Sequence, residues 1–326
     1  MKLTHILKLT IVFAFIVILM GAYTRLADAG LGCPDWPGCY GHLKVPSQAH
    51  ELEKVETHFP NAEIEPEKAW LEMIHRYLAG ILGLMVLGIL IYCLRKQNAP
   101  KFLPSFIAAL IIFQALLGMW TVTMKLMPVV VMSHLLGGFS LISLLFILYL
   151  RIKPLNLYGG DAHARQYSGL ALAALIVLVL QIILGGWTSS NYAAMACTTL
   201  PFCQGDWINN LKIANAFSPF QGEHLSFEYG VLDYATRMTI HVSHRIGAII
   251  TSILLVILAV KLLRSRTELI RNSAIIMLLL LVVQLTLGIS NIVYHLPLPV
   301  AVAHNGGAAL LLLSLVYINF AIWRKA

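Results

Sequence analysis

Residues 70–76 read Trp-Leu-Glu-Met-Ile-His-Arg, which places a carboxylate, an imidazole and a guanidinium at the mouth of a long apolar segment. Ionisable groups inside a bilayer are costly and usually serve a function. On a helix, residues three apart share a face, so Glu72 and His75 point the same way. A histidine near the outer end of an apolar segment recurs at three further positions: His134, His244 and His304. These four histidines indicate functional sites inside a membrane protein.

The composition supports a membrane protein of many spans. Of the 326 residues, 59% are hydrophobic and only 12% are charged, which is too apolar for a soluble domain. The net charge of +8 comes from cations that flank apolar segments, where they act as orientation signals. They form no interleaved basic and aromatic patch, so we expect no nucleic-acid partner.

Eight apolar stretches are each long enough, at about 20 residues, to cross a hydrocarbon core. They lie near residues 9–27, 74–94, 102–124, 129–150, 167–189, 240–263, 272–294 and 299–323. We therefore predict an all-α integral membrane protein with eight transmembrane helices. The first stretch resembles a cleaved signal peptide, but the same segment reappears in mid-chain, where no signal can be cleaved.

The basic residues predict the orientation in the membrane. The tails and the loops after the second, fourth and sixth stretches hold Lys2, Lys8, Arg95, Lys96, Lys101, Arg151, Lys153, Arg165, Lys261, Arg264, Arg266, Arg271, Arg324 and Lys325. By the positive-inside rule, both termini are cytoplasmic and the two long loops face outward. The first long loop is acidic, and we expect a solvated surface for Glu51, Glu53, Glu56, Glu63, Glu65 and Glu67.

The chain is an internal duplication. Gly21-Ala-Tyr-Thr with Cys33 and Cys39 aligns without a gap on Gly185-Gly-Trp-Thr with Cys197 and Cys203. Further matches pair His75-Arg76 with His244-Arg245, Gln114-Ala-Leu-Leu-Gly with Gln284-Leu-Thr-Leu-Gly, and His134 with His304. Such self-similarity is typical of repeated architecture. We predict two pseudo-symmetric four-helix bundles, residues 1–155 and 156–326, related by an axis along the membrane normal.

Each long loop opens with a cysteine pair, Cys33 with Cys39 and Cys197 with Cys203, on the side where disulfides persist. Two structural disulfides are the preferred interpretation. A redox role is an alternative, since an exposed pair exchanges with thiols. Metal binding would need further histidine or cysteine ligands nearby. Cys93 reads as a small buried hydrophobe.

The four histidines fall into two pairs at similar depth, His75 with His134 and His244 with His304. Two imidazoles from facing helices of a four-helix bundle are a common way to ligate a haem iron. Small residues follow each histidine and offer flat walls for a porphyrin: Ala79, Gly137, Gly138, Gly247, Ala248, Gly306 and Gly307. Helix packing explains these small residues equally well, but it leaves the histidines unexplained.

Arg76 and Arg245 follow a histidine in each half, where they could pair with haem propionates. Snorkelling, or a salt bridge to a loop carboxylate, is the alternative. Three residues before the first histidine, half one has Glu72 where half two has His241. A carboxylate at a haem edge suits proton transfer, or it orients an imidazole. We therefore predict a catalytic site in half one and an electron-carrying site in half two. The roles of His241 and His295 stay open.

Together, the eight spans, the duplicated halves, the cysteine pairs and Glu72-x-x-His75-Arg76 with the other three histidines resemble the haem A synthase family, bacterial and mitochondrial. The resemblance covers nearly the whole chain and points to a bacterial member. It implies oxidation of the C8 methyl group of haem O to a formyl group, which gives haem A for terminal oxidases. It also implies location in the bacterial inner membrane, with periplasmic long loops.

The resemblance further implies residue roles. His244 and His304 would hold a haem b cofactor, His75 and His134 would ligate the substrate haem, Glu72 would be catalytic, and the loop cysteines would form disulfides. Haem O synthase and terminal oxidase assembly would be the partners, beside membrane lipid, and the electron-transfer partner is open. A bis-histidine iron has no free position, so either one ligand leaves or water attacks after electron removal. Both routes stay open.

Two other classes compete with this interpretation. A membrane di-haem b electron-transfer cytochrome would need the four histidines but not Glu72. A transporter built from parallel repeats would need broken helices and charges at the midplane, and the sequence indicates neither.

Overall fold

The computed structural model describes residues 3–60, 63–153 and 161–323, and these ranges contain helices but no strand. The eight long helices are α1 (Leu3–Leu26), α3 (Pro66–Arg95), α4 (Phe102–Thr123), α5 (Pro128–Ile152), α7 (Ser168–Ser190), α9 (Tyr234–Leu262), α10 (Glu268–Val293) and α11 (Leu298–Trp323). Three short helices are α2 (Ala49–His58), α6 (Ala162–Arg165) and α8 (Ile213–Ala216).

All eight long helices are long and apolar enough to cross a membrane, which confirms the predicted all-α protein with eight spans. Many large apolar side chains point outward from the helices, as Leu84 and Ile249 do with exposed fractions of 70% and 61%. In water such exposure would be unfavourable, whereas lipid tails are as apolar as these side chains. The chain is therefore a multi-pass membrane protein.

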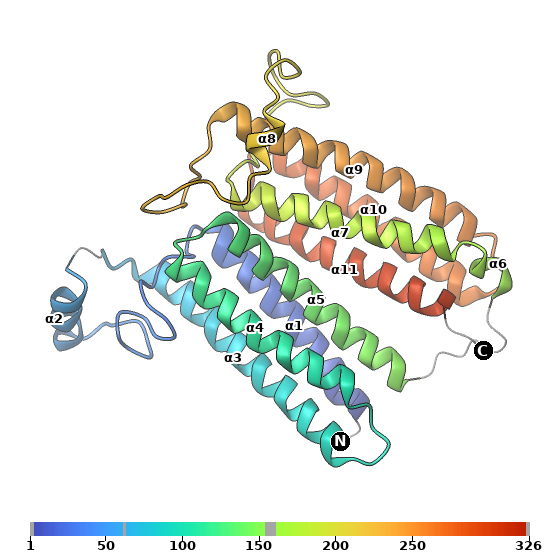
Figure 1. Ribbon diagram of the computed structural model, residues 1–326, viewed down its shortest axis with the longest axis horizontal. Helices are drawn as coiled ribbons and strands as arrows, with labels where there is room; N and C mark the ends of the chain where they lie inside the picture. The colour runs from blue at the N-terminus through green and yellow to red at the C-terminus, as the bar shows by residue number, and fades with distance from the viewer. Residues whose placement is uncertain (1–2, 61–62, 154–160, 324–326) are drawn as a thin grey trace.

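The helices form two groups of four that lie side by side (Figure 1). In the first group, α1 and α4 each pack against both α3 and α5; in the second, α7 and α10 each pack against both α9 and α11. The groups meet where α1 contacts α11 and where α5 contacts α7 and α11. This arrangement agrees with two four-helix halves. Their pseudo-symmetry stays a prediction, and the predicted boundary at residues 155 and 156 lies outside the described residues.

Backbone conformation repeats between the halves at the ends of the helices. Residues with positive φ occur at Asp28 (49°) and Tyr192 (52°), and again at Lys125 (50°) and His295 (57°). Non-glycine residues adopt this left-handed conformation uncommonly. Asp28 and Tyr192 follow the first helix of each half, and Lys125 and His295 follow the third. The duplication in the sequence thus extends to how these helices end.

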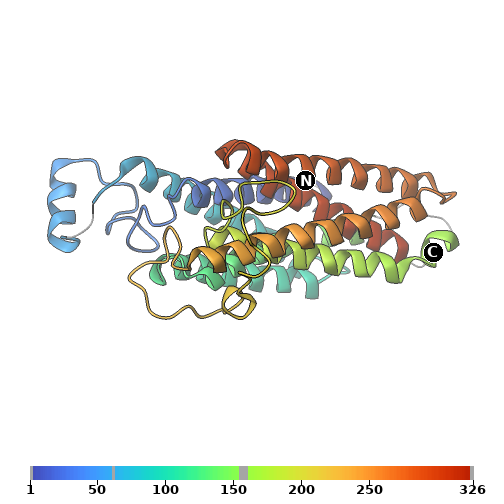
Figure 2. The ribbon, with the colours of Figure 1, turned by 90° about the horizontal axis from the view of Figure 1, so that it is seen from above.

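The long loops, with α2 and α8, lie at one end of the molecule, and the start of α1 and the end of α11 lie at the other (Figures 1 and 2). This places the two long loops on one side, as an even number of spans per half requires. Three of the basic residues used to predict orientation, Lys2, Arg324 and Lys325, lie outside the described residues.

Three helices begin at least six residues earlier than hydropathy predicted. The spans expected to begin at residues 9, 74 and 240 begin at Leu3, Pro66 and Tyr234. Hydropathy detects only the part of a helix that contacts hydrocarbon, while these helices continue into the polar region. Proline at the first helical position favours a start at Pro66, and the Asp233 side chain caps α9 by accepting from Thr236 N at 3.0 Å. The histidine at position 75 thus lies inside α3 rather than at its mouth.

The prediction of a solvated acidic loop is wrong for one residue. Glu53 and Glu56 are exposed, but Glu51 is buried. Its carboxylate accepts hydrogen bonds from the backbone N–H groups of Ser47 at 3.0 Å and Gln48 at 3.1 Å. These groups lie at the start of α2, where backbone N–H groups have no partner inside the helix, so Glu51 satisfies them.

Candidate functional site

In the first half, His75 on α3 and His134 on α5 face one another. Their ring centroids are 6.5 Å apart and the ring planes are nearly perpendicular, at 88°. The two helices are not sequential neighbours, since α4 lies between them in the chain. The fold therefore brings together two histidines separated by 59 residues in the sequence, as the pairing predicted from their depth requires.

In the second half, His244 lies on α9 and His304 on α11, the helices that correspond to α3 and α5. The two halves thus present the same arrangement, one histidine pair from the second and fourth long helices of each four-helix group.

Every one of the four imidazoles lies against a glycine of a neighbouring helix. A Cβ atom built on each glycine would meet the imidazole Cε1 at 2.8 Å for Gly21 and His75, 3.4 Å for Gly118 and His134, 3.1 Å for Gly185 and His244, and 3.1 Å for Gly288 and His304. The Gly21 distance is shorter than real Cβ contacts, the Gly185 and Gly288 distances are tighter than most, and the Gly118 distance is at the edge of ordinary contact. A side chain at Gly21, Gly185 or Gly288 would therefore crowd the imidazole, whereas Gly118 has more room. Sequence reasoning found them as repeat markers but missed this role, which requires knowing which helices are neighbours.

The His75 and His134 pair fits a bound haem. Metal–imidazole nitrogen bonds are about 2 Å long, so two imidazoles on opposite sides of one iron have ring centroids roughly 6 Å apart. The observed 6.5 Å matches that spacing. The buried Nδ1 atoms of His75, His134 and His304 have no hydrogen-bond partner in the protein. In the described ranges no three histidine, cysteine, aspartate or glutamate side chains converge on a metal-sized site.

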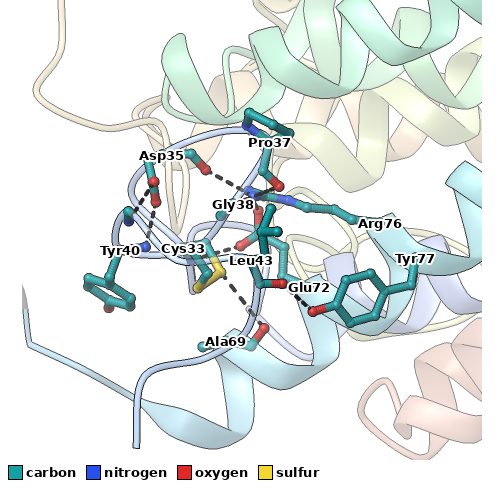
Figure 3. Close-up of a disulfide and its surroundings, with 12 residues drawn as sticks. Cys33, Asp35, Pro37, Gly38, Tyr40, Leu43, Ala69, Glu72, Arg76 and Tyr77 are labelled. Carbon is teal, nitrogen blue, oxygen red and sulfur yellow. Dashed lines mark hydrogen bonds and ion pairs between the residues drawn. A yellow bond between two sulfur atoms is a disulfide. The ribbon is translucent and has the colours of Figure 1, made fainter. Parts of the chain in front are cut away.

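Glu72 on α3 is buried and its carboxylate is held by the first disulfide loop (Figure 3). Oε2 accepts a hydrogen bond from Cys33 N at 2.9 Å, and Oε1 forms an ion pair with Arg76. The carboxylate therefore contacts the loop and its own helix rather than the His75 ring, whose Nδ1 has no partner. Orientation of the imidazole by Glu72, one of the two roles suggested by the sequence, is not what this geometry provides.

Arg76 and Arg245 fasten the two loops in the same way. Arg76 Nη1 donates to the carbonyl oxygens of Asp35 at 2.9 Å, Pro37 at 3.3 Å and Gly38 (Figure 3). Arg245 donates to the carbonyls of Cys197 at 2.7 Å, Thr199 at 2.8 Å and Pro201 at 3.5 Å. Charged donors make the stronger kind of hydrogen bond. Contact of either arginine with a haem propionate stays a prediction.

Both cysteine pairs form disulfides, Cys33 with Cys39 and Cys197 with Cys203, and Cys93 is a buried free thiol. Each disulfide closes a loop of seven residues above the arginine that binds it. Because Cys33 also donates its backbone N–H to Glu72, the first disulfide loop forms part of the wall of the first site.

The halves differ at the position of Glu72. His241 is buried there, and its Nδ1 lies 3.0 Å from the carbonyl oxygen of Ala193. This contact ties α9 to the segment after α7, so His241 has a structural partner of its own. His295 is exposed in the turn between α10 and α11, before the helix that bears His304.

Comparison of the sequence with known proteins shows which family the chain belongs to. The sequence matches the cytochrome oxidase assembly protein family over residues 4–316. It is 64% identical to the Heme A synthase of Shewanella oneidensis over 326 residues, which is 100% of this chain and 98% of that protein. The chain belongs to the cytochrome oxidase assembly protein family.

More distant members of the cytochrome oxidase assembly protein family resemble the chain along its length. The Heme A synthase of Rhizorhabdus wittichii is 28% identical and that of Nitrosospira multiformis 26% identical, each over 97% of this chain and over 92% and 91% of the relative. The family match begins in α1 and ends in α11. It therefore includes both histidine pairs, Glu72 and both disulfide loops.

Proposed function

We propose that this protein is a haem A synthase, an oxidoreductase that converts the C8 methyl group of haem O to a formyl group and so supplies haem A to terminal oxidases. The observation that carries the proposal is the 64% identity over the whole chain to a protein of that name. The position of the site adds support, because haem O has a long farnesyl tail. A site between membrane helices spares the transfer of that tail through water.

In this proposal His75 and His134 ligate the substrate haem, and His244 and His304 hold a haem b cofactor. The bound haem supplies the redox chemistry of its iron. The assignment of substrate to the first half is supported by Glu72, a buried carboxylate one turn before His75, where the second half has His241. Glu72 would accept a proton or bind a polar group near the porphyrin edge, held in place by Cys33 N–H and Arg76.

The proposal includes a location and partners. The cation-rich loops would face the cytoplasm with both termini, and the disulfide loops would face the periplasm of a bacterial inner membrane. Haem O synthase would deliver the substrate and terminal oxidase assembly would receive the product. The substrate haem O and the product haem A are both large apolar molecules, so we expect both to be transferred within the membrane.

Extraction of pigments from the purified protein tests this function. The protein is expressed with a haem O synthase in a host that makes no haem A, and its pigments are separated. We expect haem b together with haem O and newly formed haem A. A His75→Ala variant, which keeps the C-terminal pair, should retain haem b and form no haem A.

The same pigment extraction distinguishes the proposed enzyme from a di-haem electron-transfer cytochrome. Two haem b per chain, with no haem O or haem A even when haem O is supplied, would indicate a di-haem electron-transfer cytochrome and would contradict the proposed enzyme.

A further inference from the structure

Two of the four imidazoles are contacted by a glutamine side chain from the helix that bears their glycine. Gln181 Nε2 on α7 lies 3.0 Å from His244 Nδ1 and also donates to the His244 carbonyl oxygen at 3.0 Å. Gln284 Nε2 on α10 lies 3.4 Å from His304 Nε2, on the other ring nitrogen, and His304 Nδ1 has no partner. The Oε1 atoms of both glutamines are buried without a partner. Rotation of the amide exchanges its oxygen and nitrogen, so each glutamine can also accept the N–H of an imidazole.

A third glutamine, Gln114 on α4, occupies the same place beside His134. Each of the three glutamines precedes the glycine that faces its histidine by four residues, and each amide lies over the glycine three residues after that histidine. A Cβ atom would meet the glutamine side chain at 1.7 Å on Gly137, 2.2 Å on Gly247 and 2.3 Å on Gly307. The glutamine and the second glycine therefore form a matched pair. Gln114 Nε2 and His134 Nδ1 are both buried without a hydrogen-bond partner, so the position of Gln114 over Gly137 is what places it with the other two glutamines.

His75 is the exception on both counts. The residue four before Gly21 is Val17 rather than glutamine, and the residue three after His75 is Leu78 rather than glycine. Val17 and Leu78 belong to the same apolar cluster, so the space that a glutamine amide fills elsewhere is filled by hydrocarbon. His75 Nδ1 is buried with no hydrogen-bond partner, as are the Nδ1 atoms of His134 and His304. What sets His75 apart is that Val17 and Leu78 stand where the other three sites have a glutamine and a glycine.

A hydrogen bond to the distal nitrogen of a ligand histidine fixes its tautomer and orientation and raises its basicity, and loss of such a partner weakens metal binding about 10–100-fold. We infer that Gln114, Gln181 and Gln284 are positioning residues that hold three ligand histidines in place, and that His75, which lacks one, is the axial ligand that detaches from the substrate haem. This inference rests on the proposed function.

The position of His75, the ligand inferred to detach, places the vacated site near Glu72. If His75 detaches, the open coordination position lies on the α3 side of the haem, the side on which Glu72 is fixed by Cys33 N–H and Arg76. The second half has no weak ligand, since His244 and His304 both have a glutamine. Of the two routes left open by the sequence, the structure thus favours departure of one ligand, and it identifies which one.

Carbon monoxide is a suitable probe, because it binds reduced haem only at an open or easily vacated position. The full chain is purified with haem O and haem b bound and reduced, and CO binding is followed by absorption. We expect CO to bind one haem in the unsubstituted protein. Replacing Val17→Gln together with Leu78→Gly installs the missing pair, and this variant should bind CO about 10–100-fold more weakly while it retains haem O.

The reverse exchange is the matched control and does not depend on burying a new glutamine. Gln181→Val with Gly247→Leu gives His244 the surroundings of His75. This exchange is made in a His75→Ala, His134→Ala background, so that only the C-terminal haem site remains. We expect the haem b of that protein to become CO-reactive, whereas the background protein with Gln181 and Gly247 intact should not bind CO.

The inference is overturned if the unsubstituted protein binds haem O but no CO, or if neither exchange changes CO binding. If Val17→Gln with Leu78→Gly does not fold, the reverse exchange decides alone: CO binding to its haem b supports the inference, and none contradicts it. Failure of the proposed function looks different, because the unsubstituted protein would then contain no haem O and make no haem A.

Discussion

Glu72 is engaged at both carboxylate oxygens, and both partners are donors. Protonation of the carboxylate would therefore weaken its contacts with Cys33 N–H and with Arg76. Protonation of Glu72 would thus loosen the attachment of the first disulfide loop to α3. Removing one partner of a buried ion pair is strongly destabilising, because the other charge is left uncompensated. If Glu72 is protonated, the charge of Arg76 is not left wholly without partners, because Arg76 also donates to the carbonyl oxygen of Asp35 in the loop.

We predict that Glu72→Gln lowers the rate of haem A formation by about 10²- to 10⁴-fold, the usual contribution of a general acid or base. Glutamine keeps the size of the side chain and can still accept from Cys33 N–H, so bound haem should be retained. The measurement is haem A formed per bound haem b. The control is Glu67→Gln, on the exposed part of the same helix. Full turnover in Glu72→Gln would show that the carboxylate is not catalytic.

The first long loop should lose stability in acid through Glu51. Hydrogen bonds from the backbone N–H groups of Ser47 and Gln48 lower the pKa of Glu51 from 4.5 to about 2. The folded pKa lies below the unfolded value, so the stabilisation is complete above about pH 4.5 and is lost as the pH falls towards 2.

We expect amide hydrogen exchange in α2, corrected for the intrinsic rate, to show less protection at pH 3 than at pH 6. Glu51→Gln should remove most of this pH dependence, whereas Glu53→Gln, an exposed position, should keep it. Equal pH dependence in all three proteins would contradict the role of Glu51.

At the scale of helices, the contact between a glycine and an imidazole decides where each ring lies. A methyl group at Gly185 would approach His244 Cε1 to 3.1 Å, so the ring or the helix has to shift. Overpacking of this kind costs about 1–3 kcal/mol. We predict that Gly185→Ala loses haem b on dilution more readily than the unsubstituted protein. Gly169→Ala, on the same helix with open space around it, is the control and should retain haem b. Similar loss in both variants would refute a specific contact.

The sequence predicted the eight helices and the pairing of His75 with His134, because apolar length and repeated motifs are local signals. It did not predict where α3 and α9 begin, since these helices continue past the hydrocarbon. It also missed the burial of Glu51, the contacts of Arg76 and Arg245 with loop carbonyls, and the glycines that receive the imidazoles. Each of these depends on neighbours far away in the sequence, and a single sequence does not show which segments meet.

For the molecule as a whole, we predict that the two long loops lie on the side opposite the cation-rich connections. A phosphatase reporter that is active only outside the cytoplasm should be active when fused after Gly222, in the second long loop, and inactive when fused after Asn98, between α3 and α4. The reverse pattern would contradict the orientation inferred from the basic residues.

Because each group of four helices begins and ends on the same side, neither has to be inverted for the two to be joined head to tail. A four-span ancestor could therefore have worked as a homodimer, with identical iron sites, before fusion made the two copies separate positions for mutation. In the fused chain the two copies are separate positions, so one half carries Glu72 where the other carries His241.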